Sequence, residues 1–152
     1  QNRIVLGGNE KSVQVIEKIY KTIFPSTTII KTDATTAEMI KYLTNTFLAT
    51  KVSFANEIKM ICDKIDVDYD KVVEYSLYDK RLGNSHWSVP GPDGKLGFGG
   101  SCFPKDINAL IYFAKDKGLD LDLLQSVWET NLKVRPEKDW EDLKGRAVVK
   151  KD

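Results

Sequence analysis

The stretch that decides the fold is residues 37–65, which read AEMIKYLTNTFLATKVSFANEIKMICDKI. It contains neither proline nor glycine, and its apolar residues recur at helical spacing on more than one face. A helix that is apolar on two faces is buried between partners. The sequence therefore predicts a helix over 36–65 that forms the spine of the molecule and a contact between two copies of the chain. Thr35 and Thr36 are available to cap its first turn.

The residues before this helix predict the end of an α/β sheet. Residues 3–7 and 27–32 are short β-rich runs, and the segment 12–24 between them carries apolar residues at helical spacing. Strand, helix and strand in this order form one unit of a parallel sheet. Two strands alone are not stable, so we expect residues 1–33 to be the C-terminal end of a larger, Rossmann-like dinucleotide-binding domain. The glycine fingerprint of such a domain is absent from this sequence.

Helical periodicity returns three times after the long helix. We expect a short helix at 69–78, a second from Pro104 to about Lys117 and a third over 119–134. The irregular segment between 79 and 97 is rich in glycine and proline, and a loop of this length in a compact domain is usually functional or disordered. The predicted fold class is therefore mainly α, with residues 34–135 forming a helical domain.

Residues 97–106, GFGGSCFPKD, carry the candidate chemistry. Their glycines allow positive φ and close approach of the backbone to a ligand. Proline is favoured at the first helical position, so a helix beginning at Pro104 would place Cys102 at a helix N-terminus, where the macrodipole favours a thiolate. Asp106 lies within local reach and could orient the thiol or position a water. On these residues alone, a small, buried and inert cysteine is an equal alternative.

Lys41 and Asn45 stand one turn apart on the predicted long helix and point the same way. An ammonium group in this position could stabilise developing negative charge, and the amide could orient a water. An ordinary solvated pair is the alternative interpretation, and the residues alone favour it.

The composition argues against several classes of function. The 152 residues include 23 Lys and Arg against 22 Asp and Glu, a net charge of +1, so no strong field gathers nucleic acid or an anionic membrane. No apolar run is long enough to span a bilayer, and no signal-peptide pattern is visible. Two cysteines and one histidine, His86, provide neither a disulfide framework nor a metal site. We expect a cytoplasmic protein without a metal, in which Cys62 is a buried hydrophobic residue.

Three segments resemble the UDP-glucose/GDP-mannose dehydrogenase family. Residues 97–106 resemble its active-site signature, Gly-Phe-Gly-Gly-x-Cys-Phe-x-Lys-Asp. Residues 41–49 read KYLTNTFLA and are similar to its Lys-x-x-x-Asn-x-x-Leu-Ala segment, and residues 79–83 read DKRLG and are similar to its Asp-x-Arg-Ile-Gly element. The resemblance covers nearly the whole chain, and it implies that residues 136–152 are a linker into a truncated C-terminal UDP-binding domain with its first strand.

The resemblance implies NAD-dependent oxidation of the C6 alcohol of a nucleotide sugar to a carboxylate, in a homodimer. Cys102 would attack the intermediate aldehyde, Lys41 would stabilise the oxyanion, and Asn45 and Asp106 would position the hydrolytic water. Cys102 and Lys105 would lie beside the cofactor. The implied substrate-binding residues are Lys41, Asn45, Arg81, which reaches across the dimer to the nucleotide, and the loop over the sugar, Asp93, Gly94, Lys95, Leu96, Gly97, Phe98 and Gly99.

The expected reaction is UDP-glucose to UDP-glucuronate, although GDP-mannose and UDP-N-acetylhexosamine 6-dehydrogenases share the signature. A non-catalytic helical dimerisation module is the alternative from another class. Because the glycine fingerprint and most of the third domain are absent, we do not expect the 152 residues alone to turn over. We expect His86 to pack or to contact the sugar rather than to act as a general base.

Overall fold

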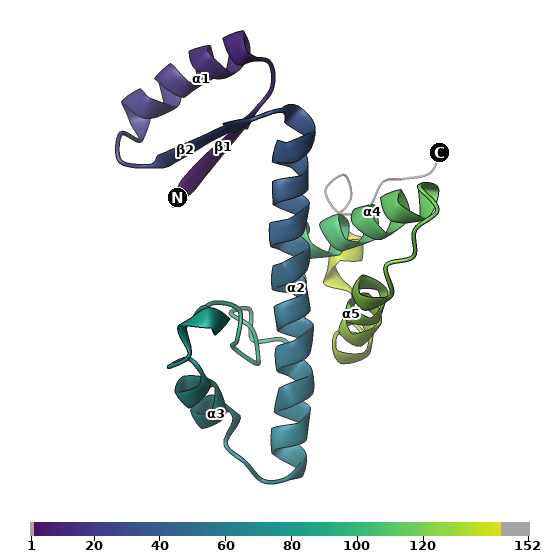
Figure 1. The fold of residues 1–152 in the computed structure, drawn as a ribbon. Coiled ribbons are helices and arrows are strands. Elements are labelled where there is room, and N and C mark those ends of the chain that lie inside the picture. Colours follow the sequence, from purple (N-terminus) through teal and green to yellow (C-terminus); the bar gives the residue numbers. More distant parts are fainter. Residues whose placement is uncertain (1, 144–152) are drawn as a thin grey trace. The chain divides into compact units, whose positions relative to one another are not determined.

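The computed structural model describes residues 2–143, which form two compact units that divide within one helix, after Thr44 (Figure 1). The described residues are mainly helical and include one small parallel sheet, as the sequence predicts. Among them, no helix combines the length and the apolarity that crossing a bilayer requires. The C-terminal strand expected from the family resemblance lies outside the described residues.

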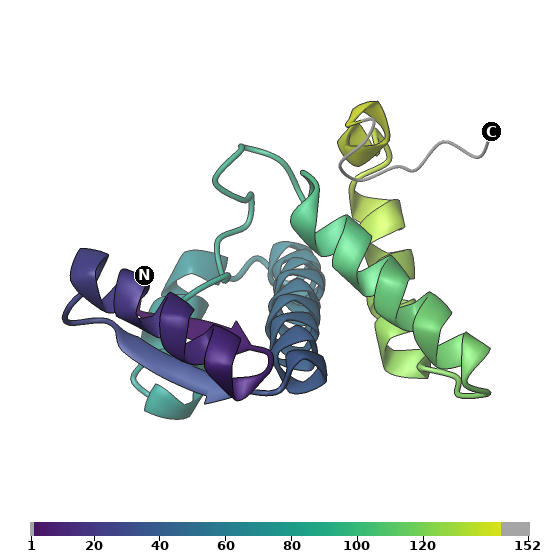
Figure 2. The ribbon, with the colours of Figure 1, turned by 90° about the horizontal axis from the view of Figure 1, so that it is seen from above.

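The first unit contains strand β1 (Arg3–Gly7), helix α1 (Glu10–Ile23), strand β2 (Thr28–Thr32) and the start of helix α2. The strands pair in parallel, with Arg3 opposite Thr28 and Gly7 opposite Thr32. Helix α1 lies along this pair (Figure 2). Buried Ile4, Leu6 and Val13 form the core of the unit. Among the described residues, three apolar side chains of α1 are exposed: Val15, Ile19 and Ile23.

Helix α2 (Ala34–Lys64) is 31 residues long and begins two residues earlier than the sequence predicts. The expected caps, Thr35 and Thr36, both lie inside the helix. Asp33 caps it instead, because its Oδ1 accepts a hydrogen bond of 2.9 Å from the Thr36 amide and its backbone carbonyl accepts one from Ala37. An aspartate satisfies the unpaired N–H groups of a first turn as well as threonine does.

The second unit is built on both sides of the C-terminal part of α2. Helix α3 (Tyr69–Ser76) and the short 3-10 turn η1 (Lys80–Leu82) lie on one side, and helices α4 (Cys102–Asp116) and α5 (Asp122–Val134) on the other (Figures 1 and 2). Each side has its own core: Ala55, Cys62, Tyr69 and Val89 pack on the α3 side, and Ala49, Phe98, Ile107 and Val127 pack on the α4 and α5 side. A second 3-10 turn, η2 (Asp139–Asp142), follows α5.

In the second unit, two helices begin at residues other than those expected. Helix α4 begins at Cys102 rather than Pro104, and the Lys105 amide donates to the Ser101 carbonyl over 3.3 Å. Proline is tolerated throughout a first turn because those N–H groups have no intrahelical acceptor. Helix α5 begins at Asp122 rather than near Leu119. Gly118 ends the preceding helix at a φ of +73°, as expected of a C-terminal glycine.

Candidate active site

Helix α4 presents Cys102 as its first residue, with the thiol exposed. The Oγ of Ser101 lies 4.0 Å from the Sγ of Cys102. The start of a helix is electropositive because its first N–H groups point outward without intrahelical acceptors. Cys62 is 5% exposed and packs in the α3-side core. The alternative in which Cys102 is a buried core residue is therefore wrong, and the expected burial of Cys62 is confirmed.

The structure brings Asn45 of α2 and Asp106 of α4 together. Asn45 Nδ2 donates a hydrogen bond of 2.6 Å to Asp106 Oδ2, and the Lys105 ammonium pairs with the other carboxylate oxygen. The Asp106 side chain is fully buried, so these contacts offset the cost of removing its charge from water. Asp106 stands one helical turn after Cys102. Cys102 and Asp106 thus lie on adjacent turns of α4, and Asn45 lies on α2, against which α4 packs.

Lys41 lies on α2 within the first unit, one turn before Asn45. Its ammonium nitrogen is 5.9 Å from the centroid of the Tyr42 ring. Its expected action on an oxyanion stays a prediction.

A cleft of about 500 Å³ opens beside the residues that precede Cys102. Four members of the expected sugar loop line this cleft: Asp93, Gly97, Phe98 and Gly99. Gly100 and Phe103, which lie on either side of Cys102 in the sequence, line it as well. Gly94, Lys95 and Leu96 lie outside this lining, and the Lys95 carbonyl instead accepts a hydrogen bond of 2.8 Å from the Gly91 amide. Residues 97–100 thus line the cleft, whereas residues 94–96 belong to a turn outside its lining.

His86 also lines the cleft, and its ring centroid lies 5.7 Å from that of Phe103. Burial and, secondarily, the charge of Lys51 lower the pKa of His86 below its usual value. The imidazole is therefore favoured in its neutral form. This position agrees with packing against Phe103, and a contact with sugar stays a prediction.

Arg81 lies in η1 and is exposed, away from the cleft lining. Its guanidinium Nε donates to Asp79 Oδ1 over 2.9 Å, and this ion pair raises the pKa of Arg81 and lowers that of Asp79. Lys51 was not identified from the sequence, yet it holds the same turn. Lys51 is 8% exposed, donates to the carbonyls of Leu82 and Gly83 over 3.1 and 3.3 Å, and lies over the Trp87 ring.

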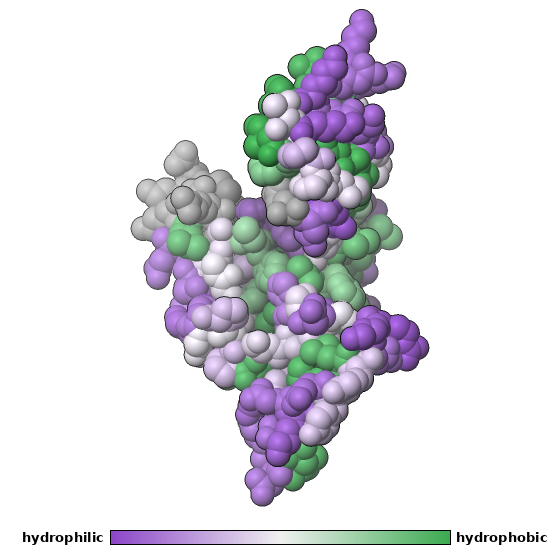
Figure 3. All heavy atoms as spheres, turned by 90° about the vertical axis from the view of Figure 1, so that its left-hand side faces the viewer, coloured by the Kyte–Doolittle hydropathy of each residue, from purple (hydrophilic) through white to green (hydrophobic). Residues whose placement is uncertain are grey.

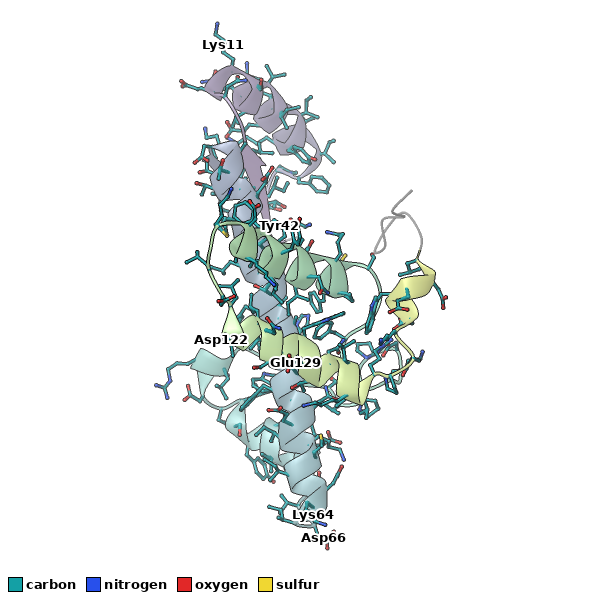
Figure 4. All side chains as sticks on the ribbon, turned by 90° about the vertical axis from the view of Figure 1, so that its right-hand side faces the viewer. Lys11, Tyr42, Lys64, Asp66, Asp122 and Glu129 are labelled. Atoms are coloured by element: carbon teal, nitrogen blue, oxygen red, sulfur yellow. The ribbon has the colours of Figure 1, made fainter. Side chains whose placement is uncertain are left out.

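Four further residues that sequence reasoning did not assign to the site contact the loop before Cys102: Asn56, Asn131, Arg135 and Asp139. Asn131 and Arg135 are one helical turn apart at the end of α5, which crosses the view in Figure 4 with Asp122 and Glu129 marking its course. Both are buried, at 0% and 2% exposure. Two polar residues one turn apart on the otherwise apolar inward face of this helix were the signal that could have found them.

The α3 side carries a second, smaller pocket of about 240 Å³, lined mainly by apolar residues that include Phe54, Tyr69 and Trp87. Figure 3 looks onto this side of the second unit, where apolar side chains gather among hydrophilic ones. The pocket contains none of the expected catalytic residues. Its composition suits packing rather than polar chemistry.

Comparison with known proteins relates residues 35–133 to the central domain of the UDP-glucose/GDP-mannose dehydrogenase family, whose model they match. The chain is 42% identical to the UDP-glucose 6-dehydrogenase YwqF of Bacillus subtilis, over 86% of this chain and 28% of the relative. It is 40% identical to the UDP-glucose 6-dehydrogenase of Rickettsia bellii, over 97% of this chain and 35% of the relative. The chain therefore spans about a third, or less, of the length of these relatives.

Solved structures show the same relationship. A UDP-glucose dehydrogenase from the archaeon Pyrobaculum islandicum superposes with a TM-score of 0.78 at 36% identity, over 87% of this chain and 29% of the other. The UDP-N-acetyl-mannosamine dehydrogenase Cap5O of S. aureus superposes with a TM-score of 0.62 at 28% identity, over 90% of this chain and 30% of the other.

Proposed function

The chain belongs to the UDP-glucose/GDP-mannose dehydrogenase family, and we propose from this that it carries the catalytic centre of a nucleotide-sugar 6-dehydrogenase. The proposed reaction oxidises the C6 alcohol of UDP-glucose to the carboxylate of UDP-glucuronate. The observation that supports it most directly is the exposed Cys102 thiol at the start of α4, one turn from the Asn45–Asp106 pair.

Cys102 acts as the covalent nucleophile. Its thiolate adds to the C6 aldehyde and forms a carbon–sulfur bond, which gives a thiohemiacetal. Loss of a hydride from that carbon gives a thioester, and attack by water breaks the carbon–sulfur bond to release the carboxylate and the thiolate. Covalent capture keeps the aldehyde in the site between the two oxidations.

Asn45 and Asp106 position the hydrolytic water. Asp106 is fully buried and accepts its hydrogen bond from the Asn45 amide, so it fixes the orientation of that amide. The amide in turn orients the water against the thioester. Lys41 stabilises the negative charge that develops on the C6 oxygen during each addition.

NAD, when bound, accepts the hydride from each of the two oxidations. The residues of this chain that would hold it are Cys102 and Lys105, on the first turn of α4. The Lys105 side chain is 41% exposed while its ammonium pairs with Asp106. A helix N-terminus with an adjacent cation fits a cofactor that carries phosphates.

The cleft beside residues 97–100 receives the sugar, and its backbone groups and Phe98 form the wall. Arg81 serves the nucleotide of the substrate bound to the other copy of the chain, because its guanidinium suits a diphosphate and stands exposed on η1. UDP-glucose is favoured by the names of the curated relatives. UDP-N-acetylhexosamine is the second candidate, since one of the similar structures is a UDP-N-acetyl-mannosamine dehydrogenase.

We further propose that α2 forms the interface of a homodimer. Phe47, Phe54 and Ile61 recur at seven-residue spacing along α2 and are 61%, 51% and 55% exposed. Residues seven apart lie on one face of a helix. A second copy of the chain would bury this row of apolar side chains.

A domain graft tests the proposed reaction. Residues 35–142 replace the corresponding part of the B. subtilis relative YwqF, and NADH formation is followed with UDP-glucose, GDP-mannose and a UDP-N-acetylhexosamine. We expect oxidation of UDP-glucose, a loss of at least about a thousandfold with Cys102→Ser, and retained activity with the matched control Cys62→Ser. Equal activity of the Cys102→Ser graft would refute the nucleophile, and a folded, dimeric but inactive graft would support the non-catalytic module.

A further inference from the structure

The backbone of residues 93–100 forms hydrogen bonds with side chains of residues 131–139, which come much later in the sequence. Asn131 contacts both backbone groups of Phe98: its Oδ1 accepts from the Phe98 amide over 2.7 Å, and its Nδ2 donates to the Phe98 carbonyl over 3.0 Å. This is the pattern a neighbouring β-strand would offer. Asn131 is fully buried, so its two hydrogen bonds satisfy the backbone N–H and C=O groups of Phe98 in place of water.

Arg135 reaches the same loop in two places and links it to η2. Its guanidinium donates to Asp93 Oδ2 over 2.7 Å, to the Leu96 carbonyl over 3.2 Å and to Asp139 Oδ1 over 2.6 Å. The other oxygen of Asp139 accepts from the Gly100 amide over 3.2 Å. The Arg135 side chain is 2% exposed, and the rigid fork of its guanidinium lets one side chain satisfy three acceptors in different directions.

The glycines before Cys102 lie where these side chains approach. A Cβ on Gly99 would stand 2.3 Å from Arg135 Nη2, and a Cβ on Gly97 would stand 2.4 Å from Asn131 Oδ1. Both distances are too short for real atoms. We expected the glycines of this loop to allow close approach of a ligand. Gly97 and Gly99 instead leave room for the side chains of Asn131 and Arg135.

We propose that Asn131, Arg135 and Asp139 are positioning residues, here named the loop clamp, which fix the backbone of 93–100 and thereby the cleft wall and the approach to Cys102. Gly97, Phe98, Gly99 and Asp93 line the cleft, and each is contacted by the clamp or lies against it. The functional part of this inference rests on the proposed reaction. The structural part does not, because the contacts exist whatever the cleft binds.

Amide hydrogen exchange in the 152-residue chain tests the clamp without turnover. Arg135→Lys keeps the charge, but a single ammonium nitrogen replaces three guanidinium nitrogens, each of which bonds to a different acceptor, and it cannot lie within reach of all three. We expect exchange of the Phe98 and Gly100 amides to accelerate about tenfold or more, although neither amide bonds to Arg135 itself, while amides in α3 keep their rates. Unchanged exchange at residues 97–100, or the same acceleration throughout the second unit, would overturn the proposal.

A matched pair of glycine variants gives an independent check. Gly97 and Gly94 have φ values of +65° and +75°, so alanine strains the backbone similarly at both, but only the Cβ at Gly97 meets Asn131. We expect Gly97→Ala to accelerate exchange at Phe98 at least about tenfold more than Gly94→Ala does. Equal effects would show that strain alone matters and would contradict the clamp.

The grafted enzyme separates the clamp from the proposed reaction. Arg135→Lys should lower kcat about tenfold or more for the nucleotide sugar, while iodoacetamide still modifies Cys102 at a rate within about twofold of the parent, because the thiol stays exposed. Unchanged kcat and KM in an active graft would overturn the clamp and leave the reaction standing. An inactive graft with accelerated exchange in Arg135→Lys would contradict the reaction and leave the clamp standing.

Discussion

At the scale of single residues, the site depends on one buried carboxylate. Asp106 is fully buried and is held by the Asn45 amide and the Lys105 ammonium. A buried carboxylate that loses a donor keeps its desolvation cost without the compensating contact. We therefore expect the Asn45–Asp106 pair to stabilise the packing of α4 as well as to take part in the proposed chemistry.

The first prediction concerns Asn45→Ala, which removes the donor to Asp106. We expect the free energy of unfolding to fall by about 1–3 kcal/mol, the usual cost of a buried polar group without its partner. Urea denaturation followed by circular dichroism measures it, with the exposed Asn84→Ala as the matched control. Equal stability of the two variants would show that the Asn45–Asp106 contact does not support the fold.

At the scale of elements, the loop before α4 and the turn after α5 are joined by charges. Arg135 lowers the pKa of Asp139 and that of Asp93 below the ordinary aspartate value of 3.8, because its guanidinium bonds to both carboxylates. Lys95 adds a weaker attraction on Asp139. A carboxylate whose pKa is lower in the folded state stabilises the fold above its unfolded pKa and loses this effect as the pH falls through the folded value.

Asp139→Asn should be less stable than the parent chain by a constant amount above about pH 5, and the difference should shrink as the pH falls below 3.8. Urea denaturation of both proteins between about pH 2.5 and 7 measures the difference in free energy of unfolding. A difference that stays constant, or grows, toward low pH would contradict the ion pair between Asp139 and Arg135.

At the scale of the whole molecule, residues 2–143 leave apolar surface on α2 uncovered. Phe47, Phe54 and Ile61 form an exposed row along α2. Solitary exposed apolar side chains are ordinary, but a row on one face of a helix marks an interface. The proposed homodimer gives these residues a partner.

The third prediction is that the chain sediments as a dimer at micromolar concentration and that Phe47→Glu with Phe54→Glu makes it monomeric. Glutamate at the centre of an apolar interface would leave unpaired buried charges. Analytical ultracentrifugation reads the mass directly, and Val15→Glu with Ile19→Glu on α1 is the matched control, since those side chains are equally apolar and exposed. A parent chain that is monomeric throughout would contradict the α2 interface.

Much of the architecture followed from patterns along the chain. The parallel β1–β2 unit and the mainly helical remainder came from periodicity, and the proximity of Cys102 and Asp106 came from their spacing on one helix. The helix boundaries at Cys102 and Asp33 did not, since proline fits several first-turn positions and a preceding aspartate can cap as well as threonine. The contacts of Asn131 and Arg135 with the glycine loop could not be foreseen, because they join residues that only the folded chain brings together.

If Cys102 is an activated nucleophile, its alkylation rate at neutral pH should be higher than that of an ordinary thiol. Iodoacetamide modification of Cys102 and Cys62 is followed by mass spectrometry in the folded chain and in urea. A thiol at a helix N-terminus is more reactive than one in an unfolded chain. We predict that Cys102 reacts faster in the folded chain than in urea, whereas buried Cys62 reacts more slowly when the chain is folded. A Cys102 that reacts no faster in the folded chain than in urea would contradict it.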